Sequence, residues 1–158
     1  MNAPIRDWQG QRVWLMGASS GIGAALARTL AAAGARVALS ARRAERVAAL
    51  AGELPGALVL PCDATDAAAI AQARDRLAAD WGGIDLAIYL AGDYTPMRAW
   101  EYAPDAAAHM IAVNFTGALS FAAALTPQLM RQGAGQIAFV SSVAGYRGLP
   151  KALVYGPT

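Results

Sequence analysis

A glycine-rich turn near the amino terminus is the stretch of this sequence that points most clearly to chemistry. It follows the apolar run 13–16, opens an alanine-rich stretch, and reads Gly17, Ala18, Ser19, Ser20, Gly21, Ile22 and Gly23. Gly17 permits a tight turn, Gly21 lets a phosphate approach the backbone, and Gly23 lets a helix pack closely on a strand. Unpaired N–H groups at the start of the following helix attract phosphate. The turn therefore predicts a binding site for nucleotide phosphates, with an ordinary tight turn as the alternative.

The spacing G-x-x-x-G-x-G resembles that of the short-chain dehydrogenase/reductase family. The resemblance implies a Rossmann fold over residues 1–158, a doubly wound parallel sheet that is incomplete at its carboxyl side and binds a nicotinamide dinucleotide. Two places depart from the family: Met16 stands where a Thr is usual, and residues 89–92 read Tyr-Leu-Ala-Gly instead of Asn-Asn-Ala-Gly. Because both changes replace polar groups by apolar ones, we expect packing contacts in place of hydrogen bonds there.

Ser142 and Tyr155 are thirteen residues apart, the spacing that the family uses for its catalytic Ser and Tyr. Asn114 lies in a long apolar stretch, where the family has a catalytic Asn. The resemblance implies that Tyr155 acts as general acid or base while hydride passes between the cofactor and a carbonyl or alcohol substrate. Ser142 would stabilise the substrate oxygen, and Asn114 would hold a water in a proton relay. The family's catalytic Lys would fall at position 159, so we expect a chain ending at Thr158 to be inactive.

The end of the second predicted strand indicates which nicotinamide cofactor is preferred. In dinucleotide-binding folds an acidic residue at this point binds the ribose 2′-hydroxyl of NAD, whereas an Arg accommodates the 2′-phosphate of NADP. This chain has Ala41 where an Asp would favour NAD, and Arg42 and Arg43 follow it. A guanidinium can pair with a phosphate through two parallel N–H groups. We therefore predict a preference for NADPH over NADH; the alternative is that the two Arg residues only begin a solvated helix.

Two further segments resemble contact points of the family with the adenosine half of the cofactor. Asp63 would accept a hydrogen bond from the adenine amino group, with the backbone of Ala64 also in contact. Asp63 could instead be a turn or capping residue ahead of Asp66. The small residues Ala91 and Gly92 would let the backbone lie against the adenosine ribose.

Strand-like and helix-like stretches alternate along the chain, and these elements must position the residues above. Short apolar runs predict five strands, at 13–16, 36–40, 57–60, 86–90 and within 135–141. Helices are predicted at 22–33, 44–53, 66–81 and 104–132. Asp66 caps the third helix, Gly82 ends it, and Pro127 should bend the fourth. The alternation predicts an α/β fold, with a parallel sheet covered by helices on both faces.

Composition excludes several classes of function. The 158 residues are 56% hydrophobic with a net charge of +2, which provides a core but no basic stripe for nucleic acid. The one Cys, Cys62, is expected to be a packed side chain, and the Cys and His content predicts no metal site. Arg28, Arg36, Thr126 and Pro127 interrupt the apolar stretches, so we expect no membrane span and a cytoplasmic protein. We expect a homodimer or homotetramer when the chain is complete.

Other chemistry-bearing residues have simpler explanations. Lys151 precedes Tyr155 by four residues but is expected at the surface, and His109 is expected to face solvent or a dimer partner. The substrate pocket would be lined by bulky side chains, which suggest a hydrophobic or aromatic carbonyl compound: Tyr94, Met97, Trp100, Tyr146 and Leu149. Two other functions remain open, a non-catalytic nucleotide-binding or interaction protein and, with a less fitting glycine spacing, a nucleotide-sugar epimerase.

Overall fold

A computed structural model of the chain describes residues 4–158. Five parallel strands form one sheet in the order β3-β2-β1-β4-β5. They are β1 (Arg12–Met16), β2 (Arg36–Ser40), β3 (Leu58–Val59), β4 (Leu86–Tyr89) and β5 (Gln136–Phe139). The predicted α/β fold is confirmed, and its five strands fall where the sequence placed them, with β3 and β5 shorter than expected.

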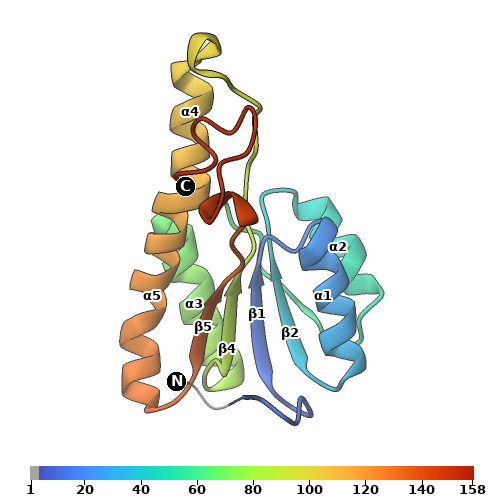
Figure 1. Cartoon of the computed structure of the whole chain (residues 1–158). Helices are drawn as coiled ribbons and strands as arrows, with labels where there is room; N and C mark the ends of the chain where they lie inside the picture. Colours follow the sequence, from blue (N-terminus) through green and yellow to red (C-terminus); the bar gives the residue numbers. More distant parts are fainter. Residues whose placement is uncertain (1–3) are drawn as a thin grey trace.

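Helices cover both faces of the sheet (Figure 1). On one face lie α1 (Gly21–Ala32) and α2 (Ala44–Gly52), and on the other lie α3 (Ala67–Trp81) and α5 (Gly117–Gln132). Strand β1 supplies both cores because its side chains alternate. Val13 and Leu15 pack with α1 and α2, whereas Trp14 and Met16 pack with α3 and α5.

The ends of α3 follow the sequence prediction. The Asp66 carboxylate accepts hydrogen bonds from the backbone N–H groups of Ala68 and Ala69, both at 2.9 Å, and so caps the helix. Gly82 ends it in the left-handed conformation, with φ of 73°.

The predicted long helix is continuous in space but not in its hydrogen bonding. It consists of α4 (Pro104–Ile111), the π-helical turn η2 (Ala112–Thr116) and α5. The irregular turn therefore surrounds Asn114, and not Pro127, where the sequence predicted a bend. Residues 104–132 together are long and apolar enough to cross a membrane, with mean hydropathy 1.4 over a window that is 28% buried. This is weak evidence by itself, since core helices of soluble proteins meet the same criterion.

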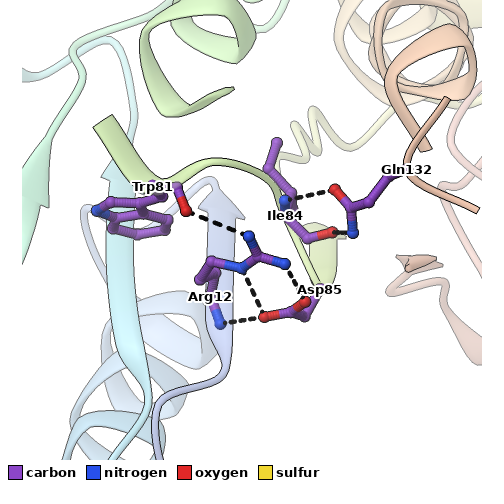
Figure 2. A network of polar contacts seen from close by, with 5 residues as sticks. All are labelled: Arg12, Trp81, Ile84, Asp85 and Gln132. Carbon is purple, nitrogen blue, oxygen red and sulfur yellow. Dashed lines mark hydrogen bonds and ion pairs between the residues drawn. The ribbon is translucent and has the colours of Figure 1, made fainter. Parts of the chain in front are cut away.

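A polar network joins the amino ends of β1 and β4 (Figure 2). The Arg12 guanidinium donates to both carboxylate oxygens of Asp85, at 2.5 and 2.9 Å, and to the carbonyl oxygen of Trp81 at 3.2 Å. The side-chain amide of Gln132, at the end of α5, bonds to the N–H and C=O groups of Ile84. The network fixes the edge of the sheet opposite to the one that carries the predicted functional residues.

Candidate cofactor site

A cavity of about 260 Å³ opens at the carboxyl ends of β1, β2, β3 and β4. Parallel sheets bind ligands at this edge. All the predicted cofactor residues except Gly21 line it, together with five others. The predicted ones are Gly17, Ser19, Ser20, Ile22, Gly23, Arg42, Arg43, Asp63, Ala64, Ala91 and Gly92, and further lining comes from Met16, Ala41, Cys62, Leu90 and Val113.

Two glycines make the turn after β1 as tight as it is. Gly17 has φ of +106°, and a Cβ there would lie 2.5 Å from the backbone nitrogen of Ala91. A Cβ on Gly23 would overlap the carbonyl oxygen of Gly17. The backbone N–H groups of Gly17 and Ala18 both donate to the carbonyl oxygen of Ser40, at 2.7 and 3.1 Å. The turn is therefore held against β2 and β4, with its backbone and the start of α1 at the cavity.

The two Arg residues that follow β2 extend in different directions. Arg43 donates to the hydroxyl oxygens of Ser19 and Ser20, at 2.8 and 3.1 Å, and so lies over the glycine turn. Arg42 lies near the ring of His109 on α4, with 3.5 Å between Nη1 and Nε2. The rim of the cavity beside β2 therefore carries two guanidinium groups.

The opposite wall of the cavity, after β3, is made by Cys62 and Asp63. The Oδ1 atom of Asp63 accepts hydrogen bonds from the N–H and the hydroxyl of Thr65, both at 2.8 Å, so this Asp does stabilise its own turn. Burial, with added repulsion from the Asp66 and Asp63 carboxylates, raises the pKa of the Cys62 thiol to about 11. The predicted packed thiol is confirmed, since Cys62 is buried.

Asn114 is held by three hydrogen bonds. Its Oδ1 accepts from the backbone N–H of Asp93 at 2.7 Å, and its Nδ2 donates to the Asp93 carbonyl at 2.9 Å. Nδ2 also donates to the Thr158 hydroxyl at 3.1 Å. That hydroxyl in turn donates to the carbonyl oxygen of Tyr155 at 3.1 Å. The predicted catalytic Asn and Tyr are therefore linked through one intervening side chain.

Ser142 and Tyr155 are not among the residues that line the cavity. The Ser142 hydroxyl oxygen accepts from the N–H of Ala144 at 3.1 Å and caps the short 3₁₀ helix η3 (Val143–Gly145). The ring of Tyr155 packs against that of Tyr94, with centroids 4.8 Å apart, beside a small cluster that includes Met97.

The segment that carries Tyr155 corrects one expectation. The family resemblance implies a helix that bears Tyr155, but residues 150–157 form turns. Lys151 has φ of +60°, which interrupts helical geometry. Pro157 has no N–H to donate and disfavours helical geometry at Gly156. Lys151 is exposed, as predicted.

One contact at the centre of the sheet differs from the expected apolar replacement. Met16 is fully buried, as a packing residue would be. The buried Tyr89, however, donates its hydroxyl to the carbonyl oxygen of Val113 at 2.5 Å, directly before Asn114. Burial raises the pKa of Tyr89, so the hydroxyl keeps its proton. A polar link between β4 and the π-helical turn is therefore retained. Neither this link nor the roles of Asp93 and Val113 could be predicted from local sequence signals.

Comparison with known proteins identifies the family. Residues 11–158 match the family model of the short chain dehydrogenases. The chain belongs to this family. It is 35% identical over 147 residues to a short-chain type dehydrogenase/reductase of Sinorhizobium fredii, covering 89% of this chain and 58% of that protein. An oxidoreductase of Staphylococcus aureus is 31% identical over 144 residues, covering 90% and 62%. The chain thus spans about 60% of the length of these curated relatives.

Solved structures of dehydrogenases agree with the fold. Serine dehydrogenase from Escherichia coli has a TM-score of 0.88 at 28% identity, covering 93% of this chain and 69% of that one. A gluconate 5-dehydrogenase from Burkholderia cenocepacia, solved with NADP and tartrate, also has a TM-score of 0.88 at 28% identity, covering 96% and 62%. The agreement with both dehydrogenase structures extends over almost the whole of this chain.

Proposed function

We propose that the protein is an NADPH-dependent oxidoreductase that interconverts a carbonyl compound and its alcohol. The observation that carries the proposal is the composition of the cavity, which combines a glycine turn with two Arg residues. Gly17 and Gly23 allow the tight turn that brings its backbone and the start of α1 to the cavity, and Ala41 offers no carboxylate to bind a 2′-hydroxyl. Arg42 and Arg43 provide the positive charge that a 2′-phosphate requires. The solved gluconate 5-dehydrogenase, which holds NADP, is consistent with this choice.

The remaining cofactor contacts follow from the same lining. The amino end of α1, beginning at Gly21, would face the pyrophosphate. Asp63 would accept a hydrogen bond from the adenine through Oδ2, because Oδ1 already bonds to Thr65. Ala91 and Gly92 would lie against the adenosine ribose.

The proposed chemistry needs a proton donor and a group that binds the substrate oxygen. When bound, the reduced nicotinamide supplies the hydride that forms the new C–H bond. The Tyr155 hydroxyl would donate its proton to the carbonyl oxygen, and would take it back from an alcohol in reverse. The Ser142 oxygen accepts from Ala144, which leaves its O–H free to donate to the substrate oxygen.

The proposed role of Asn114 is limited by the bonds it already makes. Both N–H groups of its amide are used, one by Asp93 and one by Thr158. One lone pair of Oδ1 is used by the Asp93 N–H. A relay water could therefore only donate to the Asn114 side chain, through the second lone pair of Oδ1.

For the substrate we propose a hydrophobic or aromatic carbonyl compound. A second, open hollow of about 490 Å³ lies beside the Tyr155 segment and includes Met97, Leu149 and Ala152. Tyr94, 49% exposed, packs against the Tyr155 ring, and Trp100, 80% exposed, follows Ala99 in the lining of this hollow, so both rings leave apolar surface exposed.

The proposal extends to assembly and location. Exposed apolar side chains recur along the long helix at Ile111, Phe115 and Leu119, as expected of a homodimer or homotetramer. We propose a cytoplasmic enzyme that binds neither nucleic acid nor membrane. Thirteen basic against eleven acidic residues support the first exclusion.

A nucleotide-binding protein without catalysis is the second candidate. It is favoured by the position of Ser142 and Tyr155, neither of which lines the cavity. The two candidates share the cofactor site and differ only in turnover.

The test replaces Tyr155 by Phe in the full-length protein. We expect loss of NADPH-dependent reduction across a panel of ketones, aldehydes and keto-esters, with NADPH binding within about twofold of wild type, because the change removes only a proton donor. Tyr102→Phe, at a 57% exposed position, is the matched control and should keep full turnover. Equal loss of binding and turnover in Tyr155→Phe would contradict the role of Tyr155. A wild-type protein that binds NADPH but reduces nothing would favour the second candidate.

A further inference from the structure

The contact between Arg42 and His109 joins two elements that flank the cavity from different sides. Arg42 follows β2, whereas His109 belongs to α4, 67 residues later in the chain. Their nitrogens Nη1 and Nε2 lie 3.5 Å apart, and both side chains are exposed. Sequence reasoning assigned His109 to solvent or a dimer interface and did not connect it with the cofactor.

The position of His109 on its helix places it next to the cavity. Val113, four residues later, lines the cavity from the same helix. Residues four apart on a helix lie on one face, one above the other. His109 therefore lies one helical turn before Val113, which is part of the cavity wall. The Arg42 side chain approaches His109 from the end of β2.

The chemistry of the pair favours an anion. A guanidinium carries only donors, so His109 can complete the contact only by accepting at Nε2. Among the described residues 4–158, no carboxylate forms an ion pair with Arg42. An anion placed between them would accept from Arg42 and, from a donor tautomer or the charged form of the ring, from His109 as well.

We propose that His109 is a specificity-determining residue that binds the 2′-phosphate of NADPH together with Arg42. The proposal rests on the NADPH preference proposed above and adds to it a second ligand from α4. Arg42 and His109 would hold the phosphate through charge-assisted hydrogen bonds. The affinity for NADH, which lacks this phosphate, would not depend on His109.

A different placement of the phosphate is the competing arrangement. Arg43 with the hydroxyls of Ser19 and Ser20 forms a second group of donors, over the glycine turn. A phosphate held only there would not involve α4. The two arrangements differ in whether a change at His109 affects the 2′-phosphate.

The experiment measures dissociation constants of NADPH and NADH for the full-length protein and its His109→Ala, His109→Gln and Arg42→Ala variants. Adenosine 2′,5′-bisphosphate and adenosine 5′-monophosphate serve as probes without the nicotinamide. We expect His109→Ala to weaken the binding of NADPH and of the bisphosphate about five- to tenfold, because one charge-assisted hydrogen bond is lost. The dissociation constants of NADH and of the monophosphate should change less than twofold. His109→Gln retains a donor and should recover part of the loss. Arg131→Gln, an equal loss of charge at the far end of α5, is the control and should change none of the four constants.

The outcomes separate this proposal from the one on which it rests. If His109→Ala weakens the binding of NADPH and NADH equally, His109 has a structural role and the assignment is wrong. No effect of His109→Ala, with selective NADPH loss in Arg42→Ala, would overturn it as well and would mean that Arg42 binds the 2′-phosphate without α4. If neither variant changes the ratio of NADPH to NADH affinity, the His109 assignment is wrong. A wild-type preference for NADPH would then favour the Arg43 arrangement, whereas a wild type that binds NADH as tightly as NADPH would mean that the NADPH preference itself is wrong.

Discussion

The side chain of Asn114 and the backbone of Asp93 exchange two hydrogen bonds, at 2.7 and 2.9 Å. One residue lies in the π-helical turn η2, and the other directly follows Gly92 at the cavity wall. The side-chain amide thus satisfies the backbone N–H and C=O groups of Asp93 and fixes the segment after β4 to the long helix. A residue type that is mediocre in helices is here used for its ability to bond backbone groups.

Replacing Asn114 by Asp should destabilise the protein. The carboxylate keeps the acceptor for the Asp93 N–H but loses both donors and faces the Asp93 carbonyl with a negative charge. We expect a loss on the order of 2 kcal/mol in the free energy of unfolding, measured by urea denaturation, and a lower kcat. Gln72→Glu makes the same amide-to-carboxylate change at an exposed position of α3 and should cost less than about 0.5 kcal/mol. A variant as stable as this control would show that the two bonds contribute nothing.

The end of β2 should control the choice of cofactor. Ala41→Asp with Arg42→Ile adds an acceptor for the ribose 2′-hydroxyl and removes a phosphate partner from the cavity rim. We expect the ratio of kcat/KM with NADH to that with NADPH to rise at least about tenfold. Arg42→Ile alone separates loss of NADPH binding from gain of NADH binding, because Ala41 is buried and its replacement has a packing cost of its own. An unchanged ratio in both variants would refute the assignment of this strand end.

The elements whose signals are local could be predicted from the sequence. Apolar runs predicted the five strands, and Asp66 and Gly82 predicted the two ends of α3. Each of these features depends only on residues nearby in the sequence. The cavity lining could be predicted as well, since the carboxyl ends of parallel strands meet at one edge.

What could not be predicted depends on contacts between distant segments. The π-helical turn at 112–116 contains two residues that bond to distant segments, Asn114 to Asp93 and Val113 to Tyr89. The residues of each pair are more than twenty positions apart in sequence. Proximity of Arg42 and His109 has the same origin. The turns around Tyr155 were missed for another reason, because the family resemblance outweighed the local signal from Pro157.

Cys62 should react slowly with thiol reagents. The thiolate is the reactive form, and with a pKa of about 11 only about one molecule in a thousand carries it at pH 8. Burial of the side chain slows the reaction further. We expect iodoacetamide to label the Cys62 peptide at least about a hundredfold more slowly than a free cysteine, with the rate rising as pH approaches 11. Mass spectrometry of this peptide measures the rate.

Bound NADPH should protect Cys62 still more, since the residue lines the proposed adenosine end of the cavity. The denatured protein is the control and should label at the rate of a free thiol. Fast labelling of the folded protein, unaffected by NADPH, would contradict both the burial of Cys62 and its place in the cofactor site.

The last prediction concerns the Arg12–Asp85 pair at the opposite edge of the sheet (Figure 2). Hydrogen bonds from the Arg12 side chain lower the pKa of the Asp85 carboxyl below its ordinary value of 3.8, despite partial burial. A carboxyl whose pKa is lowered by folding adds stability above its unfolded-state pKa and loses it as pH falls through its folded-state pKa. Asp85→Asn should therefore cost on the order of 2 kcal/mol near neutral pH, because it breaks charged hydrogen bonds that are about three-quarters buried.

The pH dependence distinguishes this charge effect from a packing defect. The difference in unfolding free energy between wild type and Asp85→Asn should stay constant down to about pH 5 and shrink as pH falls below about 4, because the wild-type carboxyl then becomes protonated too. Urea denaturation at a series of pH values measures it. Asp75→Asn, which removes the exposed carboxylate that pairs with Arg74 on α3, should cost less than about 1 kcal/mol. If the difference in unfolding free energy stays unchanged down to about pH 3, Asp85 acts through its shape and not through its charge.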